Sequence, residues 1–420
     1  MDAPGETSAA CWPRLRPGWP HYQLFLLGSF VSWVGDWMDL AALNWVVLER
    51  TGSAFNLGVV NACRLVPVFA LSIPAGILAD RYDRRRLLIV LQGGLMAATV
   101  VVAVLVSCQA SFGLLLGAVL VRSVVAAMVP PVRNVLVPDL VPPQALAQAI
   151  SGQMAVMNLS RIVGPAIAGF LLARVSAASV FWVNSGSFAL VLVTSFMVRV
   201  VSRIPPRQEV GWRDHVVEAV GYLRRSRSVQ ALLALAVVPM VFGFPYTALM
   251  PLFARELWGL GPEGFGALLA ASGVGALLGA AWLSVVRPPT HPGRWLVASV
   301  VAFGAALGAF ALVRGVIWAV IAVFLVGFFS QAYRTMSRIT LQAEVPPNLR
   351  GRIVGIALMD RGFIPLGALV LGGLADIVGA CGVGVVMGAG CVAISLGVLG
   401  LQPQLWRLSG GEGSWGQPQS

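Results

Sequence analysis

The chain has 420 residues, of which 58% are hydrophobic and only 11% are charged. Soluble domains carry about 25% charged residues, so this composition excludes a soluble protein and predicts one that crosses a membrane many times. The formal net charge is +12. The basic residues gather in alternate loops between apolar segments, which is the positive-inside pattern of membrane proteins, so we expect no nucleic-acid partner.

The basic residues are all arginines, because the chain contains no lysine. A Walker A phosphate loop and a Schiff base both need lysine, so we expect no ATP and neither chemistry. The five cysteines include no C-x-x-C pair and the three histidines lie far apart, so we expect no disulfide framework and no metal site. We expect no cofactor. Transport would have to run on an ion gradient or on the substrate's own gradient.

Twelve apolar segments follow one another along the chain, each close to or above the roughly 20 residues that cross a bilayer. They are too long and continuous for barrel strands, so we predict an all-α membrane protein with twelve transmembrane helices. One side of the membrane would hold only Arg50, Arg174, Arg255 and Arg314, so the other side, which holds both termini, is cytoplasmic. The predicted spans are 22–48, 54–79, 86–107, 111–131, 145–173, 179–200, 229–253, 263–286, 294–313, 316–341, 351–376 and 382–402.

The first span carries two carboxylates near its middle, Asp36 and Asp39, at a spacing that puts them on one helical face. A carboxylate at the bilayer centre costs about 2.5–3.5 kcal/mol on insertion scales, so it is expected to face a cavity or a partner. One reading is proton coupling, in which one of the two binds and releases H⁺. The other is a structural ion pair with an arginine of a neighbouring span. The possible partners are Arg64, Arg122 and Arg161.

Two tryptophans, Trp33 and Trp37, flank Asp36 in the same span. They could stack on an aromatic substrate and are candidates for the wall of a substrate cavity. Packing in the core is the more common role of such residues, and both readings stay open.

Between the second and third spans, residues 76–87 read G-I-L-A-D-R-Y-D-R-R-R-L. Charges this dense cannot lie in lipid, so the segment is predicted to be a tight surface loop, and its four arginines place it in the cytoplasm. The string G-x-L-A-D-R-x-x-R-R resembles the loop between helices 2 and 3 of the major facilitator superfamily of secondary transporters. The matching positions are Gly76, Leu78, Asp80, Arg81, Arg84 and Arg85.

The resemblance implies the major facilitator fold and a gating role for this signature loop. Asp80 would lie at the cytoplasmic end of the second span, where the eleventh span begins near Gly351. The first N–H groups of a helix lack helical partners and carry partial positive charge, so a carboxylate there can cap the helix. By the resemblance, this cap clamps the two halves together on the inside and holds the outward-facing state, with Arg84 tethering Asp80.

The longest polar stretch, 201–228, follows the sixth span and has apolar residues at helical spacing, which predicts an amphipathic helix on the inner surface. It divides the chain into an N-terminal half at 1–200, which includes a cytoplasmic tail, and a C-terminal half at 229–403, followed by a cytoplasmic tail at 404–420. Each half contains Val-Pro-Pro, at 141–143 and at 345–347, followed by a G-x4-G-x-L pattern. Six-helix halves related by internal repetition are typical of alternating-access transporters.

The sequences L-V-P-D-L-V-P-P and V-P-P-N-L-R-G-R are similar to those of a superfamily branch that contains macrolide-efflux proteins and enterobactin exporters. The branch implies drug or siderophore efflux, often by proton antiport, with H⁺ as the driving ion. Arg122 occupies the place of the helix-4 arginine of related antiporters, in an R-x-x-x-G pattern whose glycine is here Ala126. The corresponding loop of the second half, 287–294, lacks the signature aspartate.

A second set of charges lies in the tenth and eleventh predicted spans. Arg334 and Arg338 are one turn apart on the inner half of the tenth span, and Asp360 and Arg361 follow in the eleventh. We interpret them as an interhelical charge network at the cytoplasmic gate, with substrate contact as the alternative.

The sequence therefore predicts a secondary transporter, a monomer in the inner (plasma) membrane. Its expected partners are the lipid bilayer and a small-molecule substrate, namely an amphiphilic organic compound that is exported by proton-coupled alternating access. A lipid or lysolipid flippase on the same fold shares every feature above and is the alternative. A non-transporting membrane receptor or enzyme would need clustered Ser, His or Cys residues or metal ligands, which the sequence does not show.

Overall fold

The computed structural model describes residues 19–197, 218, 221–286 and 291–402, and within these ranges the chain is helical throughout, with no strand. The first part of the chain forms α1 (Trp19–Thr51), α2 (Ala54–Arg81), α3 (Arg84–Ser107), α4 (Phe112–Leu140), a short 3₁₀ turn (Pro143–Ala145), α5 (Leu146–Arg174) and α6 (Ala177–Met197). The second part forms α8 (Arg227–Val238), a π-helical turn (Pro239–Gly243), α9 (Tyr246–Trp258), α10 (Pro262–Val285), α11 (Pro292–Leu312), α12 (Val316–Glu344), α13 (Pro347–Ala357), a 3₁₀ turn (Leu358–Gly362) and α14 (Phe363–Leu401).

All twelve predicted spans correspond to helices of the described chain, so the prediction of an all-α membrane protein is confirmed. Ten helical segments are long and apolar enough to cross a membrane, and α2 adds a further helix of 28 residues. α14 is 39 residues long and holds the end of the eleventh span and all of the twelfth. The chain reverses between them at Gly379, whose φ of 73° is a conformation that favours glycine.

Three predicted spans differ from the structure: the eleventh is interrupted by the 3₁₀ turn at Leu358–Gly362, and proline explains the differences in the fourth and the seventh. The fourth span was expected to end at residue 131, but α4 continues through Pro130 and Pro131 to Leu140. Consecutive prolines each remove one donor, and a transmembrane helix tolerates that loss where its neighbours compensate. The seventh span is interrupted at Pro239, where Phe244 N–H donates to the Pro239 carbonyl at 2.8 Å and forms a π turn between α8 and α9.

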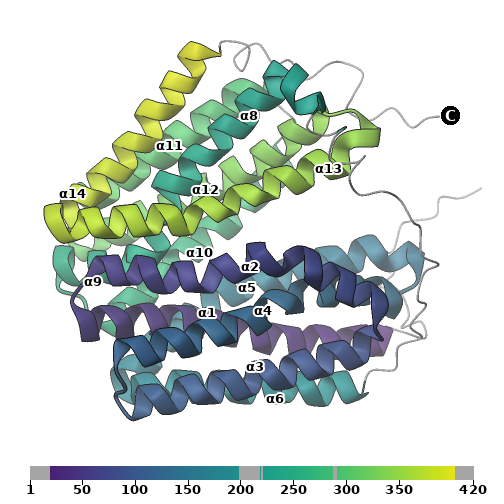
Figure 1. Cartoon of the computed structure of the whole chain (residues 1–420). Coiled ribbons are helices and arrows are strands. Elements are labelled where there is room, and N and C mark those ends of the chain that lie inside the picture. Colours follow the sequence, from purple (N-terminus) through teal and green to yellow (C-terminus); the bar gives the residue numbers. More distant parts are fainter. Residues whose placement is uncertain (1–18, 198–217, 219–220, 287–290, 403–420) are drawn as a thin grey trace, which may run out of the picture.

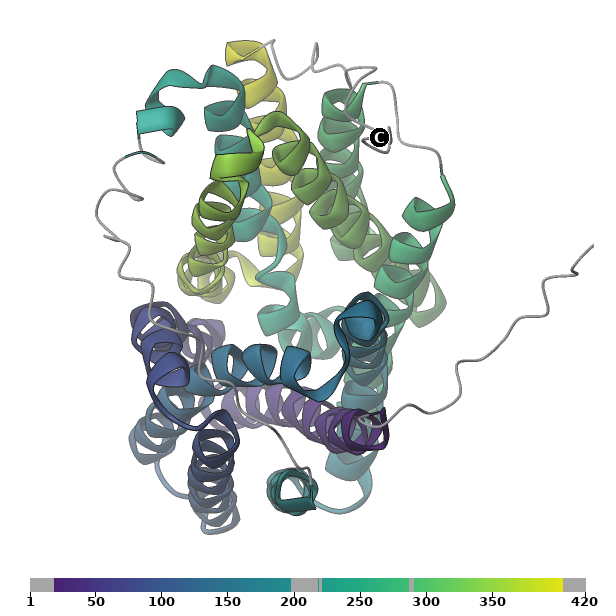
Figure 2. The same ribbon diagram turned by 90° about the vertical axis from the view of Figure 1, so that its right-hand side faces the viewer.

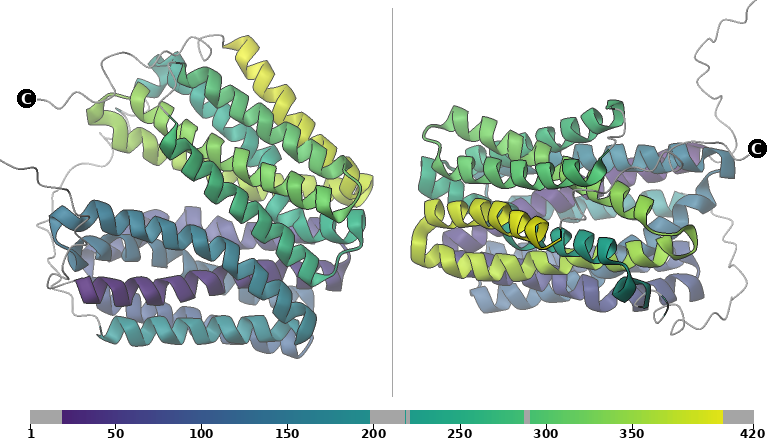
Figure 3. Two further views of the ribbon diagram at one scale, coloured as in Figure 1. Left: turned by 180° about the vertical axis from the view of Figure 1, so that it is seen from behind. Right: turned by 90° about the horizontal axis from the view of Figure 1, so that it is seen from above.

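The helices form two groups, α1–α6 and α8–α14 (Figure 1). The groups approach each other at the end where α1 ends and α2 begins, which we call the α1–α2 end (Figures 1 and 3). They separate toward the opposite end, the α2–α3 end, which faces the viewer in Figure 2. Two helix pairs, α2 with α14 and α5 with α10, make the main contacts between the groups.

Glycines allow these two helix pairs to approach closely. A Cβ added to Gly169 of α5 would lie 2.8 Å from the Pro262 carbonyl oxygen of α10, and one added to Gly58 of α2 would lie 2.5 Å from the Ala368 carbonyl oxygen of α14. Gly372 of α14 likewise faces the backbone of Ala54. Small residues at these positions let backbones pack directly against each other, as in other membrane helix pairs.

Several predicted regions lie wholly or largely outside the described residues. They are the N-terminal tail to residue 18, most of the predicted surface helix at 201–228, residues 287–290 of the loop in the second half, and the C-terminal tail from residue 403.

Candidate functional site

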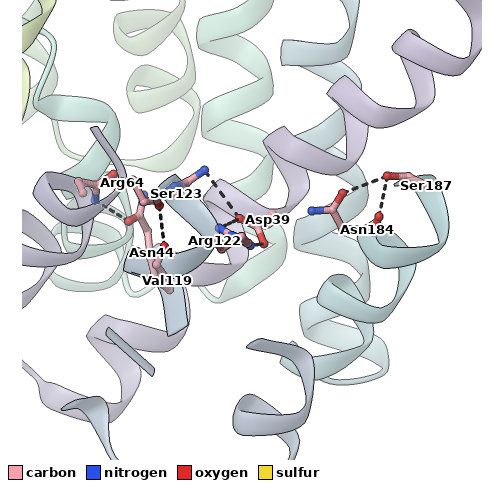
Figure 4. Close-up of polar contacts among 9 residues, drawn as sticks. Asp39, Asn44, Arg64, Val119, Arg122, Ser123, Asn184 and Ser187 are labelled. Carbon is pink, nitrogen blue, oxygen red and sulfur yellow. Dashed lines mark hydrogen bonds and ion pairs between the residues drawn. The ribbon is translucent and has the colours of Figure 1, made fainter. Parts of the chain in front are cut away.

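Asp39 of α1 is fully engaged in an ion pair inside the first group of helices (Figure 4). Both of its oxygens accept hydrogen bonds from the Arg122 guanidinium of α4, with Nη2 to Oδ2 at 2.6 Å and Nη1 bonded to Oδ1. Arg64 of α2 approaches the same carboxylate at 3.7 Å. The Asp39 side chain is only 2% exposed. This two-pronged, desolvated contact joins α1 to α4, and a proton on Asp39 would break it.

Asp36, less than one turn earlier in α1, has a different environment. It is partly exposed, accepts no hydrogen bond and has no cation within 4 Å among the residues that the structure describes. The arginine that interacts with it most strongly through space is Arg133 of α4. The structure thus separates the two carboxylates, because Asp39 is tied to arginine and Asp36 is partly exposed and has no ion-pair partner among the described residues.

Gly35 explains how the helices pack beside these charges. A Cβ at this position would lie 2.6 Å from the Ser187 hydroxyl of α6 and closer still to the Asn184 side chain. Ser187 donates to the Asn184 carbonyl oxygens of both backbone and side chain, at 2.7 and 3.0 Å. Only glycine lets α1 lie against this polar pair.

The two candidate tryptophans carry guanidinium groups on their rings. The Arg133 guanidinium of α4 lies 5.2 Å from the Trp33 ring centroid, and the Arg161 guanidinium of α5 lies 5.6 Å from that of Trp37. These are cation–π distances. Arg161, a predicted partner of the carboxylates, therefore contacts the neighbouring indole instead.

Arg133 is a residue that the sequence analysis did not single out for the site. The predicted fourth span ended before it, so it was placed in a loop rather than within the membrane helix that the structure shows. An arginine in a largely apolar stretch just after two prolines is the signal that could have found it, provided that the prolines are not taken as a helix end.

The predicted charge network of the second group is described only in part. The Arg334 guanidinium of α12 lies 3.8 Å from the Phe244 ring centroid. Arg338 is exposed one turn later, and Asp360 is partly buried in the 3₁₀ turn before α14. The side chain of Arg361 lies outside the described residues.

The signature loop is also described in part. Arg84, the first residue of α3, is buried, and Asp83 caps that helix by accepting from Arg86 N–H at 2.7 Å. Arg85 donates to the Ser195 and Phe196 carbonyls at the end of α6, at 2.9 and 2.5 Å. The side chains of Gly76, Asp80 and Arg81 lie outside the described residues, so the predicted cap of the eleventh span stays a prediction.

A carboxylate that the sequence analysis missed joins the two groups at the α1–α2 end. Asp376 of α14 accepts hydrogen bonds from the Ser53 hydroxyl at 2.7 Å, from Ala54 N–H at 2.6 Å and from Phe55 N–H at 3.1 Å. These donors are the first groups of α2, so Asp376 caps a helix of the other group. The signal was present, because residues 76–80 and 372–376 both read G-x-L-A-D.

Two further polar contacts lie at the same end. Arg174 of α5 pairs with Glu263 of α10 at 3.0 Å, and both side chains are more than half exposed. Glu256 of α9 accepts from Ala380 N–H at 3.0 Å and so caps the start of the last span.

No group of three or more metal-binding side chains occurs within the described ranges. A pocket of about 790 Å³ near Glu49 and Arg50 lies inside the first group and contains none of the candidate residues.

Comparison with known proteins decides the family. The family model described as transmembrane secretion effector matches residues 18–409, which is nearly the whole chain. The chain belongs to this family of major facilitator transporters. The recognition made from the signature loop is confirmed, and the protein is a multi-pass membrane transporter and not an enzyme.

Relatives of this family member are named for transport. It is 29% identical over 378 residues to a staphyloferrin A transporter of Staphylococcus aureus, covering 89% of this chain and 94% of the relative. It is 27% identical over 372 residues to the multidrug efflux pump Tap of Mycolicibacterium fortuitum, covering 85% of this chain and 89% of the relative. A macrolide efflux protein of Streptococcus pyogenes is 22% identical over 376 residues, covering 85% and 92%.

Solved structures show the same fold. A peptide transporter superimposes with a TM-score of 0.75 at 14% identity, covering 93% of this chain and 96% of the other. A bacterial homologue of the lysosomal transporter Spinster, in an inward-facing and unoccupied conformation, gives a TM-score of 0.69 at 17% identity, covering 92% and 98%.

Proposed function

We propose that this chain is a secondary transporter that exports an organic compound from the cell by alternating access, coupled to proton movement. The observation that carries the proposal is that two carboxylates on one face of α1 have different surroundings. Asp39 is held by Arg122 and Arg64, whereas Asp36 is partly exposed and forms neither a hydrogen bond nor an ion pair with any residue that the structure describes. Relatives named as efflux pumps support the direction.

Asp36 is the proposed proton carrier. A carboxylate within a membrane span is costly when ionised, and Asp36 can change charge without breaking any contact in the described structure. Asp39, by contrast, accepts two hydrogen bonds from the buried guanidinium of Arg122, and this ion pair depends on the negative charge of the carboxylate. Asp39 therefore holds α1 against α4, and Asp36 binds and releases H⁺.

The proposed orientation puts the α2–α3 end and both termini in the cytoplasm of a cell bounded by the plasma membrane. The arginines of the signature loop support it through the positive-inside rule. In this orientation the groups of helices are joined on the outside through Asp376 and separate toward the cytoplasm, which is the arrangement of an inward-facing transporter.

Cysteine labelling tests this orientation. Native Cys108 is exposed at the α1–α2 end, and Gln148 is exposed at the opposite end, at the start of α5. In intact cells a membrane-impermeant maleimide should label Cys108 and should not label a Gln148→Cys variant that lacks the native cysteines. The reverse pattern would overturn the orientation.

Inside-out membrane vesicles with an acidic lumen test the coupling. They should accumulate at least one of erythromycin, ethidium and benzene-1,3-dicarboxylate, and an uncoupler should abolish the accumulation. Asp36→Asn should lose uphill accumulation and keep downhill exchange. Asp39→Asn should instead lower the amount of folded protein, because it leaves Arg122 buried without its partner, a change that costs about 3–5 kcal/mol in other proteins. Uphill accumulation that survives in Asp36→Asn would remove Asp36 from the coupling.

A further inference from the structure

The candidate site in α1, α2, α4 and α5 contains more positive than negative charge. Four guanidinium groups face two carboxylates, and one of these carboxylates, Asp39, is already bonded to Arg122 and approached by Arg64. Two guanidiniums remain without an ion-pair partner among the described residues, those of Arg133 and Arg161. An excess of buried positive charge within a membrane is unfavourable unless water or a bound anion compensates it.

Arg133 is the more buried of the two. It is only 5% exposed, and its Nε atom has no hydrogen-bond partner in the described structure. Among the residues that the structure describes, Asp36 is the charged group that acts on Arg133 through space, at a distance longer than an ion pair. A buried guanidinium N–H without a partner is rare in proteins and points to a ligand that supplies the acceptor.

The indoles hold both guanidiniums in a geometry suited to an anion. Trp33 and Trp37 lie about one turn apart on α1, and each has an arginine from another helix over its ring. A guanidinium that rests on an aromatic face keeps its N–H donors at its edge free, and these donors match the two oxygens of a carboxylate. Trp33 and Trp37 thereby hold two anion-binding groups, one from α4 and one from α5, at positions about one turn apart along α1.

The depth of the site argues for a substrate and against a lipid headgroup. Arg161 lies near the middle of α5, which runs from Leu146 to Arg174. At 1.5 Å per residue it is roughly 20 Å along the helix from either end, far from the headgroups. An anion that reaches it must enter the protein.

On the basis of the transport function proposed above, we propose that the substrate is an organic anion whose carboxylate groups bind Arg133 and Arg161. The proton on Asp36 and the anion on these arginines bind to different groups, so neither displaces the other directly. The inside-negative membrane potential favours the outward movement of an anion, by roughly 50-fold in concentration ratio per charge at 100 mV. The assignment therefore fits an exporter.

A binding assay on the purified full-length protein tests the assignment without requiring transport. The probes are benzene-1,3-dicarboxylate, the neutral benzene-1,3-dicarboxamide and the cationic 1,3-bis(aminomethyl)benzene, which share one ring and differ in charge. Calorimetric titration should detect the dicarboxylate only. Arg133→Gln and Arg161→Gln should each weaken its binding about tenfold or more, because each removes a charged hydrogen-bond donor pair. Arg255→Gln, at an exposed position of α9, is the matched control and should bind as the parent does.

Further variants and probes in the same assay distinguish a carboxylate site from a general effect of charge, from inorganic anion binding and from lipid binding. Arg133→Lys keeps the charge and loses the fork of donors, so it should fold as the parent does and bind with intermediate affinity. Asp36→Asn, which removes a nearby negative charge, should bind at least as tightly as the parent, and this holds whether or not Asp36 couples transport to protons. The proposal is overturned if both glutamine variants bind the dicarboxylate as the parent does. It is also overturned if sulfate binds as tightly as the dicarboxylate and depends on the same arginines. The third contradicting result is arginine-dependent binding of phosphatidylglycerol nanodiscs without binding of the dicarboxylate.

Discussion

The two ends of the contact between α2 and the eleventh span use the same five-residue pattern with opposite direction. At the α1–α2 end, the G-x-L-A-D of residues 372–376 ends its span, and Asp376 caps the first N–H groups of α2. At the α2–α3 end, the G-x-L-A-D of residues 76–80 is the first part of the signature loop and lies in the last turns of α2, and Asp80 is predicted to cap the start of the eleventh span. Each helix thus carries at its C-terminal end an acid suited to cap the N-terminus of the other.

This comparison suggests how one pair of helices can serve two states. In the structure the groups are joined at the α1–α2 end, where the Asp376 cap is made, and they are apart at the α2–α3 end, which the proposed orientation places in the cytoplasm. We propose that the Asp80 cap replaces it when the cytoplasmic ends close. Because the two caps are chemically alike, exchanging one for the other changes the free energy of the protein little. The inward-facing and outward-facing states then have similar free energies, and both stay accessible during transport.

The largest effect is expected for Asp376→Asn. The substitution removes the negative charge that accepts from Ser53, Ala54 and Phe55 and that complements the α2 dipole. Losing this cap costs about 2 kcal/mol, which shifts the balance between the states about 30-fold toward the outward-open one. Double electron–electron resonance between spin labels on the exposed native Cys108 and Cys381, with the other cysteines replaced by serine, measures the opening.

A smaller effect of opposite sign is expected for Asp80→Asn. Loss of the predicted inner cap costs about 1–2 kcal/mol, which favours the inward-facing state roughly 5- to 30-fold and slows turnover with little loss of folding. Labels at Gln148→Cys of α5 and Gln342→Cys of α12, both exposed at the α2–α3 end, report the distance between the groups at that end. If transport is lost while these distances stay as in the parent, Asp80 acts in another way.

Ser53→Ala should reproduce the Asp376 effect in reduced form. The Ser53 hydroxyl donates to Asp376 and also accepts from Asn56 N–H at 3.4 Å, which is the N-cap hydrogen bond of α2. The substitution therefore removes one of the three hydrogen bonds to the Asp376 carboxylate, together with the N-cap bond. A loss of about 1 kcal/mol corresponds to about a fivefold shift toward the outward-open state. The same pair of labels on Cys108 and Cys381 checks this, and a shift larger than that of Asp376→Asn would contradict the assigned order.

The smallest effect is expected for Glu263→Gln. It breaks the ion pair with Arg174, which also joins the two groups at the outer end but lies mostly in solvent. Exposed pairs contribute about 0–1 kcal/mol and are screened by salt, so the distances should change little. A shift as large as that of Asp376→Asn would show that the outer contact depends on charge pairing rather than on the helix cap.

The sequence was sufficient to predict the twelve spans and the family, because long apolar runs and the signature loop are local features. It also offered Arg122 as a possible partner of Asp39, which the structure places in contact. It did not identify Asp376 or Arg133. Hydropathy does not encode how each helix is rotated about its axis or which helix lies beside it, and both residues act through helices distant in sequence.

The distance between Cys108 and Cys381 in the Asp376→Asn, Asp80→Asn double variant tests the exchange of caps most directly. If the two caps stabilise opposite states, Asp376→Asn alone lengthens this outer distance, and adding Asp80→Asn returns the distribution toward that of the parent. The account is contradicted if Asp376→Asn leaves the distance unchanged, or if adding Asp80→Asn lengthens it further.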